Sequence, residues 1–256
     1  MKKLQLTFFA FLLTCISYSQ TGFYVGGEAG VKWDNFFYIN SLGYSLGQYS
    51  YNGTWGGFAG YKLNNFTFET GFYGYYTALP DIYINYDTGE PFKGMGVSGS
   101  SSMDSWVIPF SFGYDIPFGN DHFFVKPEMT FLIYKGRDGN TGKIGGWGTG
   151  GDIPDFSWDT PIDDIELSPG TTLGFTYRQS NVNTGLGLGV SLGWRIKKRA
   201  DIYFKGTYNT TFTPILYDVI AHQLNNNERI SATNTFSGSS FGLQIGFRFY
   251  LKGNKE

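Results

Sequence analysis

Residues 185–196 read Gly-Leu-Gly-Leu-Gly-Val-Ser-Leu-Gly-Trp-Arg-Ile, with an apolar side chain at every even position. The odd positions carry glycine, Ser191 and Arg195. A side-chain period of two places these two sets on opposite faces of a β-strand. One face is apolar and the other is small and polar. The stretch therefore predicts a strand whose two sides meet different environments.

The same alternation recurs in eight segments: 23–33, 54–63, 66–73, 105–114, 125–133, 185–196, 202–207 and 241–250. Most of them are at or near the ~9–11 residues that a tilted strand needs to cross a membrane. Short connections follow the second, fourth and sixth segments, whereas long ones follow the first, third, fifth and seventh. Short turns at one end and long loops at the other are typical of outer-membrane barrels. We expect an all-β fold, an eight-stranded antiparallel up-and-down transmembrane β-barrel with four long surface loops.

The N-terminus has the pattern of a secretory signal peptide. Two lysines precede an apolar run over 4–13, and Ser17 and Ser19 fit the −3 and −1 positions of a cleavage site. We expect a signal peptide over 1–19 and a barrel domain over 20–256. No later run is apolar enough for a transmembrane helix. A membrane protein of this sequence must then be a closed barrel, which predicts the bacterial outer membrane.

Composition excludes several other classes. Aromatic residues make up 20% of the chain and charged residues 16%, whereas disordered chains are poor in aromatics and rich in charge. One cysteine cannot form a disulfide scaffold. The formal net charge of −2 offers no basic excess, so we expect no nucleic-acid partner. We expect no cofactor and no metal site.

Charged residues gather on one face of the alternating segments, which distinguishes a membrane barrel from a soluble one. A soluble up-and-down barrel such as a lipocalin has an apolar interior and a polar exterior. Here the apolar face is almost free of charge, and Trp33, Trp55, Trp106 and Trp194 are candidates for aromatic girdles. We expect a polar network in the lumen, formed by Glu28, Lys32, Lys62, Glu69, Lys126, Glu128, Arg195, Lys205 and Arg248.

Two prolines, Pro109 and Pro127, fall inside expected strands. Proline cannot donate to the hydrogen-bond ladder, and a closed barrel has no free edge to receive it. We expect a β-bulge at each position.

Four stretches carry a resemblance to a known group: 19–20 (Ser-Gln), 106–110 (Trp-Val-Ile-Pro-Phe), 206–209 (Gly-Thr-Tyr-Asn) and the final strand at 241–251. The chain resembles the eight-stranded outer-membrane barrels of Bacteroidota, the family that includes the PorT-like proteins. It is also similar in architecture to the OmpA and OmpX barrels. It departs from them in its ending, because 252–256 follow the aromatic strand. Some members of this family are accessory parts of outer-membrane machines, including the type IX secretion system, so the resemblance implies such a role.

Three functions compete for this architecture. An eight-stranded barrel is just wide enough for side chains to fill, which favours a plugged lumen and a structural or interaction role. The resemblance implies that this role is that of an accessory subunit of an envelope or secretion complex. The expected inward set holds three glutamates and six basic residues, so a narrow, anion-selective porin is the alternative. A loop-based hydrolase is more distant, since its general base is limited to His122 or His222. We expect no enzyme.

The long loops are the expected place for partner contacts. The acidic third loop, over 135–170, matches no EF-hand spacing and reads as a solvated surface. Loops on rigid scaffolds carry function, and Tyr and Trp are frequent interface anchors. Our loop interaction candidates are Tyr38, Tyr44, Tyr83, Tyr86, Phe156 and Trp158. The expected partners are outer-membrane lipid, lipopolysaccharide and proteins of an outer-membrane complex.

Overall fold

One antiparallel sheet makes up the fold. The computed structural model describes residues 21–136, 142–150, 159–196 and 199–251; the expected signal peptide lies outside these ranges. Within them, no helix is long and apolar enough to cross a membrane. The elements are β1 (Gly22–Asn40), β2 (Ser45–Leu63), β3 (Phe66–Ile84), β4 (Pro91–Tyr114), β5 (Ile116–Phe118), β6 (Phe123–Gly136), β7 (Gly142–Gly150), η1 (Ile162–Asp164), β8 (Thr171–Arg178), β9 (Val182–Ile196), β10 (Ala200–Thr211), β11 (Leu216–Gln223) and β12 (Arg229–Tyr250).

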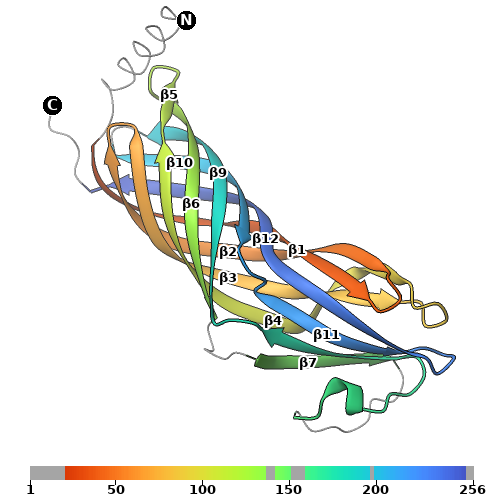
Figure 1. The fold of residues 1–256 in the computed structure, drawn as a ribbon. Helices are drawn as coiled ribbons and strands as arrows, with labels where there is room; N and C mark the ends of the chain where they lie inside the picture. Colours follow the sequence, from red (N-terminus) through yellow and green to blue (C-terminus); the bar gives the residue numbers. More distant parts are fainter. Residues whose placement is uncertain (1–20, 137–141, 151–158, 197–198, 252–256) are drawn as a thin grey trace, which may run out of the picture.

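Eight of these strands close into a barrel, as the alternation predicts. Their order is β1-β2-β3-β4-β6-β9-β10-β12, and β12 pairs back onto β1. The predicted eight-stranded antiparallel fold is confirmed. The short connections, such as the turn at Asn64 with φ of 57°, lie at the end of the barrel where both ends of the chain emerge (Figure 1). We call this the turn end.

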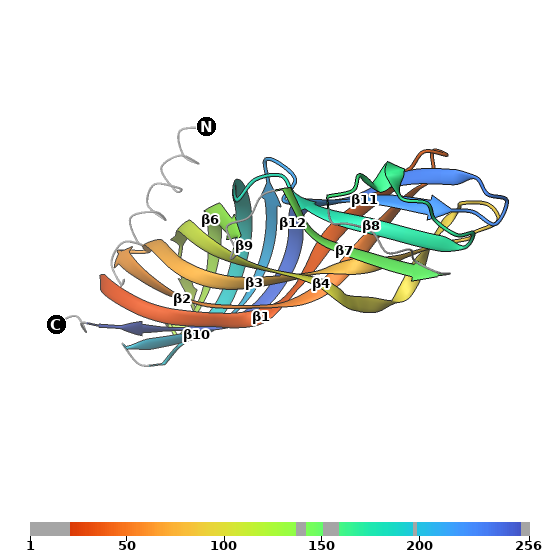
Figure 2. The ribbon, with the colours of Figure 1, turned by 90° about the horizontal axis from the view of Figure 1, so that it is seen from below.

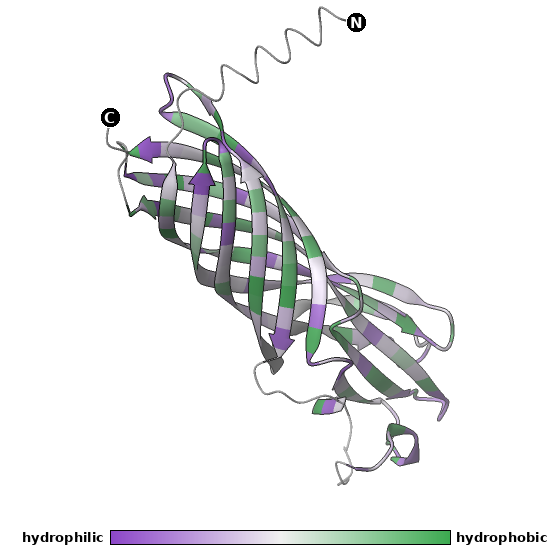
Figure 3. Ribbon diagram, turned by 60° about the vertical axis from the view of Figure 1, so that its left-hand side comes forward, coloured by the Kyte–Doolittle hydropathy of each residue, from purple (hydrophilic) through white to green (hydrophobic). Residues whose placement is uncertain are grey.

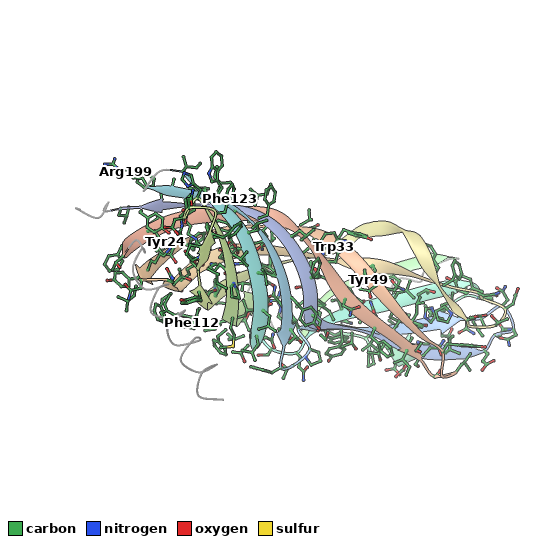
Figure 4. The ribbon with its side chains drawn as sticks, turned by 90° about the horizontal axis from the view of Figure 1, so that it is seen from above. Tyr24, Trp33, Tyr49, Phe112, Phe123 and Arg199 are labelled. Carbon is green, nitrogen blue, oxygen red and sulfur yellow. The ribbon has the colours of Figure 1, made fainter. Side chains whose placement is uncertain are left out.

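The alternation sorts side chains as the sequence predicts, with polar residues inside and apolar ones outside. Figure 3 shows green and purple positions alternating along the barrel strands. Phe112 and Phe123 lie on the outside, and Arg199 lies at the turn end (Figure 4). Inward glycines make room for large neighbours: a Cβ at Gly193 would stand 2.3 Å from the Phe124 ring. The lumen is therefore filled by side chains from facing strands.

The two prolines do not create bulges, so that expectation was wrong. The β4–β6 register runs without a shift through Pro109↔Leu132, and the β6–β9 register does so through Pro127↔Val190. The strands lose pairing partners there instead. The β3–β4 ladder skips the residues opposite Pro109. Pro127 faces the break between β4 and β5, where the backbone N–H of Asp115 donates to the Asn65 carbonyl at 2.8 Å.

The strands continue well beyond the barrel, which corrects the expectation of four long loops. The β1–β2 connection is only residues 41–44, and β3 and β4 form another long hairpin. β11 pairs with the far half of β12, β8 pairs with β11, and β7 pairs with β8. The acidic third loop thus contains β7 and η1. We call this second half of the molecule the extension (Figure 2).

The extension is a six-stranded sheet with a hairpin beside it. The sheet order is β2-β1-β12-β11-β8-β7. β2 and β3 pair only from Thr54↔Tyr75 towards the turn end, so the outer part of the β3–β4 hairpin separates from β2. The tip of the hairpin returns to the sheet, where the Asn40 amide donates to the Gly89 carbonyl at 2.9 Å. Arg229 fastens η1 to the sheet by donating to the carbonyls of Ile162 and Ile165.

Candidate functional site

The middle of the lumen holds a continuous chain of buried ion pairs. The Lys126 Nζ lies 2.9 Å from Glu69 Oε1 and 2.6 Å from Glu128 Oε2. The Lys205 Nζ lies 2.5 Å from Glu128 Oε1 and 3.3 Å from Glu28 Oε1. Each ammonium therefore bridges two carboxylates, which is how closely packed buried charges can be compensated.

Tyrosines that the sequence reasoning missed complete this layer. Tyr24 donates to Glu69 at 2.8 Å, and Tyr203 and Tyr73 donate to Glu28 at 2.7 and 3.0 Å. Each hydroxyl satisfies a carboxylate oxygen beside the lysines. The alternation of the sequence predicts that Tyr73 and Tyr203 point inward. It does not predict which acid across the lumen each hydroxyl would reach.

A second charged layer closes the turn end of the lumen. Arg248, fully buried, lies between Asp115 and Asp201, with nitrogen–oxygen distances of 3.6 and 3.7 Å. Lys62 pairs with Asp115, and Arg195 reaches the same carboxylate at 3.4 Å. Asp115 is thus shared by three basic residues, which ties together the strands that carry them at the barrel's end.

Three aspartates balance the charge of the lumen and were absent from the expected network. Asp34 pairs with Lys32, while Asp115 and Asp201 belong to the layer at the turn end. The structure brings all nine expected residues into the lumen. The lumen's six buried bases are Lys32, Lys62, Lys126, Arg195, Lys205 and Arg248, and its six buried acids are Glu28, Asp34, Glu69, Asp115, Glu128 and Asp201. The described lumen residues therefore carry no positive excess, which removes the reason to expect an anion-selective pore.

An apolar septum separates the lumen from the extension. Phe36 and Phe236 stack with ring centroids 4.9 Å apart, and Leu216 and Tyr134 pack in the same cluster. On the lumen side, the cavity lined by glutamates and Lys205 has a volume of about 40 Å³, which is room for roughly three water molecules. Among the described residues, the septum thus places apolar rings between the charged lumen and the extension, and Asp34, Thr77 and Ser240 border a small cavity beside Phe236.

Inside the extension, four side chains form a hydrogen-bonded chain. Tyr38 Oη lies 2.9 Å from His222 Nε2, and Thr172 Oγ1 lies 2.8 Å from His222 Nδ1. Tyr86 Oη continues the chain to Thr172 Oγ1 at 2.9 Å. Burial lowers the pKa of His222 to about 4, and burial raises the pKa of nearby Asp218 on the same strand to about 6. The chain joins β1, β8, β11 and the β3–β4 turn.

The structure separates the loop candidates. Tyr38 is fully buried on β1, which corrects its placement on a surface loop, and Tyr86 is partly buried by its bond to Thr172. Tyr44 and Tyr83 are exposed. Phe156 and Trp158 lie outside the described residues.

The two histidines occupy different settings. His222 is enclosed by Tyr38 and Thr172, whereas His122 sits exposed in a turn with its Nδ1 2.9 Å from the Asn120 carbonyl. Neither has a serine or cysteine among its hydrogen-bond partners in the described part of the chain. In those same ranges, no group of three or more His, Cys, Asp or Glu is arranged to hold a metal ion.

Comparisons with known proteins find fold likeness alone. No family model and no curated protein matches the chain. Among solved structures, Neisserial surface protein A is 15% identical with a TM-score of 0.40, covering 90% of this chain and 97% of its own. OprG from Pseudomonas aeruginosa is 8% identical with a TM-score of 0.46, covering 92% and 99%. A major outer membrane protein from Thermus thermophilus is 12% identical with a TM-score of 0.43, covering 90% and 99%.

Proposed function

We propose that the protein is a closed outer-membrane β-barrel with a structural or interaction role, and that it neither conducts solutes nor catalyses a reaction. The observation that carries this proposal is the lumen. Its charges are balanced one to one, its tyrosines fill the gaps, and the septum at Phe36 and Phe236 closes its outer end. Buried ion pairs of this kind hold a barrel together but leave no open path.

The outward surface supports placement in a membrane. On β12, the outward residues from Phe241 to Phe249 are apolar and exposed, whereas those from Ser231 to Ser239 are small hydroxyl residues. A lipid-facing band must be apolar, and its ends are commonly marked by aromatic girdles. Trp33 and Trp106, together with the 63% exposed Trp55, lie near the outer end of the band. The extension then stands outside the cell, and the turn end faces the periplasm.

The extension supports the interaction role. It is a sheet with its own apolar clusters around Tyr38, Ile82 and Ile84, so it presents a fixed surface rather than flexible loops. We propose that it serves an envelope complex as an accessory subunit. A cleaved signal peptide over 1–19, membership among PorT-like proteins of Bacteroidota, and contact with lipopolysaccharide remain part of this proposal.

Single-channel recording in a planar bilayer tests the closed lumen. We expect the purified protein to give no conductance steps above the leak of the lipid. The matched control is the triple variant Phe36→Ala, Phe236→Ala, Lys205→Ala, which removes the septum and one ammonium and should give small steps. Steps of equal size in both proteins would identify a narrow porin and overturn the proposal.

Gentle extraction of the tagged protein from its native membrane tests the interaction role. We expect one or more proteins to co-elute in stoichiometric amounts, as identified by mass spectrometry. A lone barrel in every detergent would contradict an accessory role even if the lumen is closed.

A further inference from the structure

An apolar hollow lies on the outside of the molecule where β2 and β3 separate. The two strands pair up to Thr54↔Tyr75 and then diverge. The hollow has a volume of about 390 Å³. It is lined by Gly53, Trp55, Gly74, Tyr75, Tyr76, Ser105 and Trp106. Its walls thus come from three neighbouring strands, at the point where the barrel gives way to the extension.

Two glycines create the space. A Cβ at Gly53 would meet nothing within 4 Å, so this position is open. A Cβ at Gly74 would stand 3.1 Å from the Trp55 indole, which therefore lies across the strand at that point. Trp106 is held from the other side by stacking on Phe72, with ring centroids 4.5 Å apart. Trp55 and Trp106 thus supply aromatic walls, and the outward position at Gly53 is open.

The hollow opens on the lipid-facing side. Gly53 and Trp55 share the outward face of β2 with exposed Gly57. Tyr76 shares the outward face of β3 with Phe72, which is 49% exposed. Among the side chains that the structure describes, no charged one lines the hollow. Tyr76 supplies a hydroxyl on this outward face and Trp55 an indole N–H, whereas Ser105 borders the hollow from a strand position on the same face as buried Val107.

We propose that this hollow binds one acyl chain of an outer-leaflet lipid. The inference rests on the proposed membrane location, because the chain must arrive from the bilayer. An apolar cleft with aromatic walls gains from burying an alkyl chain at roughly 0.8 kcal/mol per CH₂. The Tyr76 hydroxyl and the Trp55 indole suit the ester or amide that links such a chain to its headgroup, since aromatic residues with a polar tip favour the membrane interface. The bilayer is the occupant's source because the hollow is continuous with the lipid-facing band.

Native mass spectrometry with a matched pair of variants tests the site. The probe is phosphatidylethanolamine with two sixteen-carbon chains, added to delipidated protein in detergent. Gly53→Leu fills the hollow. Gly57→Leu places the same side chain on the same face of β2 outside it, where a Cβ would make an ordinary contact at 3.6 Å. We expect a single retained lipid on the unmodified protein and on Gly57→Leu, and at least a tenfold loss of that adduct on Gly53→Leu.

Chain length and fold integrity complete the experiment. A single-chain lysophosphatidylethanolamine should bind within threefold of the two-chain lipid, and shortening its chain from sixteen to eight carbons should weaken binding at least tenfold. The heat-dependent gel mobility of each variant reports whether the barrel is closed. Equal retention in both leucine variants, no discrete adduct on the unmodified protein, or a co-purified peptide at this position would overturn the proposal. None of these results bears on conductance, so the closed-lumen function stands or falls separately.

Discussion

The barrel and the extension share β1, β2 and β12, and along β12 the two faces of the strand exchange character between them. On β12, inward positions change from Arg248 and Gln244 in the barrel to Phe236 and Ile230 in the extension, all of them buried. Outward positions change in the opposite sense, from apolar residues to serine and threonine. In the proposed membrane placement, lipid would surround the barrel and water the extension, which accounts for the exchange of the strand's two faces.

The exchange occurs at an irregularity in the sheet. Between Asp34 and Phe36 on β1, the register against β12 shifts, and β12 accommodates extra residues around Gly238 with φ of 73°. A bulge increases local bending and twist. The same level holds the septum of Phe36 and Phe236, so the break in the ladder, the end of the charged lumen and the start of the apolar interior coincide. The two halves should therefore respond differently to the same kind of substitution.

The largest effect is expected from removing a lumen charge. Arg248→Met leaves Asp115 and Asp201 with fewer positive neighbours in a buried site. Breaking a buried ion pair from one side costs about 3–5 kcal/mol. We expect the free energy of unfolding, measured by denaturant titration in detergent, to fall by about 4 kcal/mol. The exposed Arg199→Met is the control and should change it little. A loss below about 1 kcal/mol for Arg248→Met would show that the lumen charges are hydrated rather than packed.

The inversion also explains which parts of the fold could be predicted from the sequence. In the barrel, charged and apolar residues alternate strongly along each strand, and the eight strands follow from that contrast. In the extension the contrast weakens and differs between strands. On β12, serine and threonine lie outside and Ile230 inside, whereas on β2 Tyr49 is exposed and Gln48 is buried. The alternation predicts strands with charged residues on one face and apolar residues on the other. That pattern stops where the barrel ends, so the sequence predicts loops for the parts of the strands beyond it.

The site residues divide in the same way. The nine charged lumen residues lie within the alternating segments and could be placed on the inward face. Asp34, Asp115 and Asp201 lie just outside the expected segments. Asp34 is two residues from Lys32 on the same strand, whereas only the folded barrel brings Asp115 to Lys62 and Asp201 to Arg248. The hollow beside Gly53 has no sequence signal, because it arises from two strands parting.

An intermediate effect is expected from the buried acid of the extension. Asp218 contacts Asn234 on β12, whose amide donates at 3.4 Å, and burial raises its pKa to about 6. When folding raises the pKa of an acid, the folded protein loses stability as the pH rises from the acid's ordinary pKa of 3.8 to its folded-state pKa of about 6. Asp218→Asn should therefore stabilise the extension by about 2–3 kcal/mol at pH 7 and hardly at pH 4. Hydrogen exchange of β11 and β12 amides measures this.

His222 supplies the opposite control. Its pKa is lowered to about 4 by burial, so its neutral form is favoured and stability is lost as pH falls from about 6.5 to 4. His222→Gln should abolish the loss of stability at low pH. It should leave unchanged the loss of stability at higher pH, because that loss comes from Asp218. If each variant changes hydrogen-exchange protection by the same amount at pH 4 as at pH 7, the pKa values of Asp218 and His222 are not shifted by burial.

The smallest effect concerns how the β3–β4 hairpin is held. In the barrel its two strands pair with β2 and β6, but in the extension it is attached through its inner apolar side chains and its tip. Tyr86→Phe removes the hydroxyl that meets Thr172 Oγ1 at 2.9 Å and should lower the free energy of local opening by about 1 kcal/mol. Tyr83→Phe, exposed and stacked on Phe92, should change it little. Hydrogen exchange at residues 82–86 distinguishes the two. An unchanged rate in Tyr86→Phe would mean that Ile82 and Ile84 alone hold the hairpin, and that the hydrogen-bonded chain through His222 stabilises the sheet without reaching its cover.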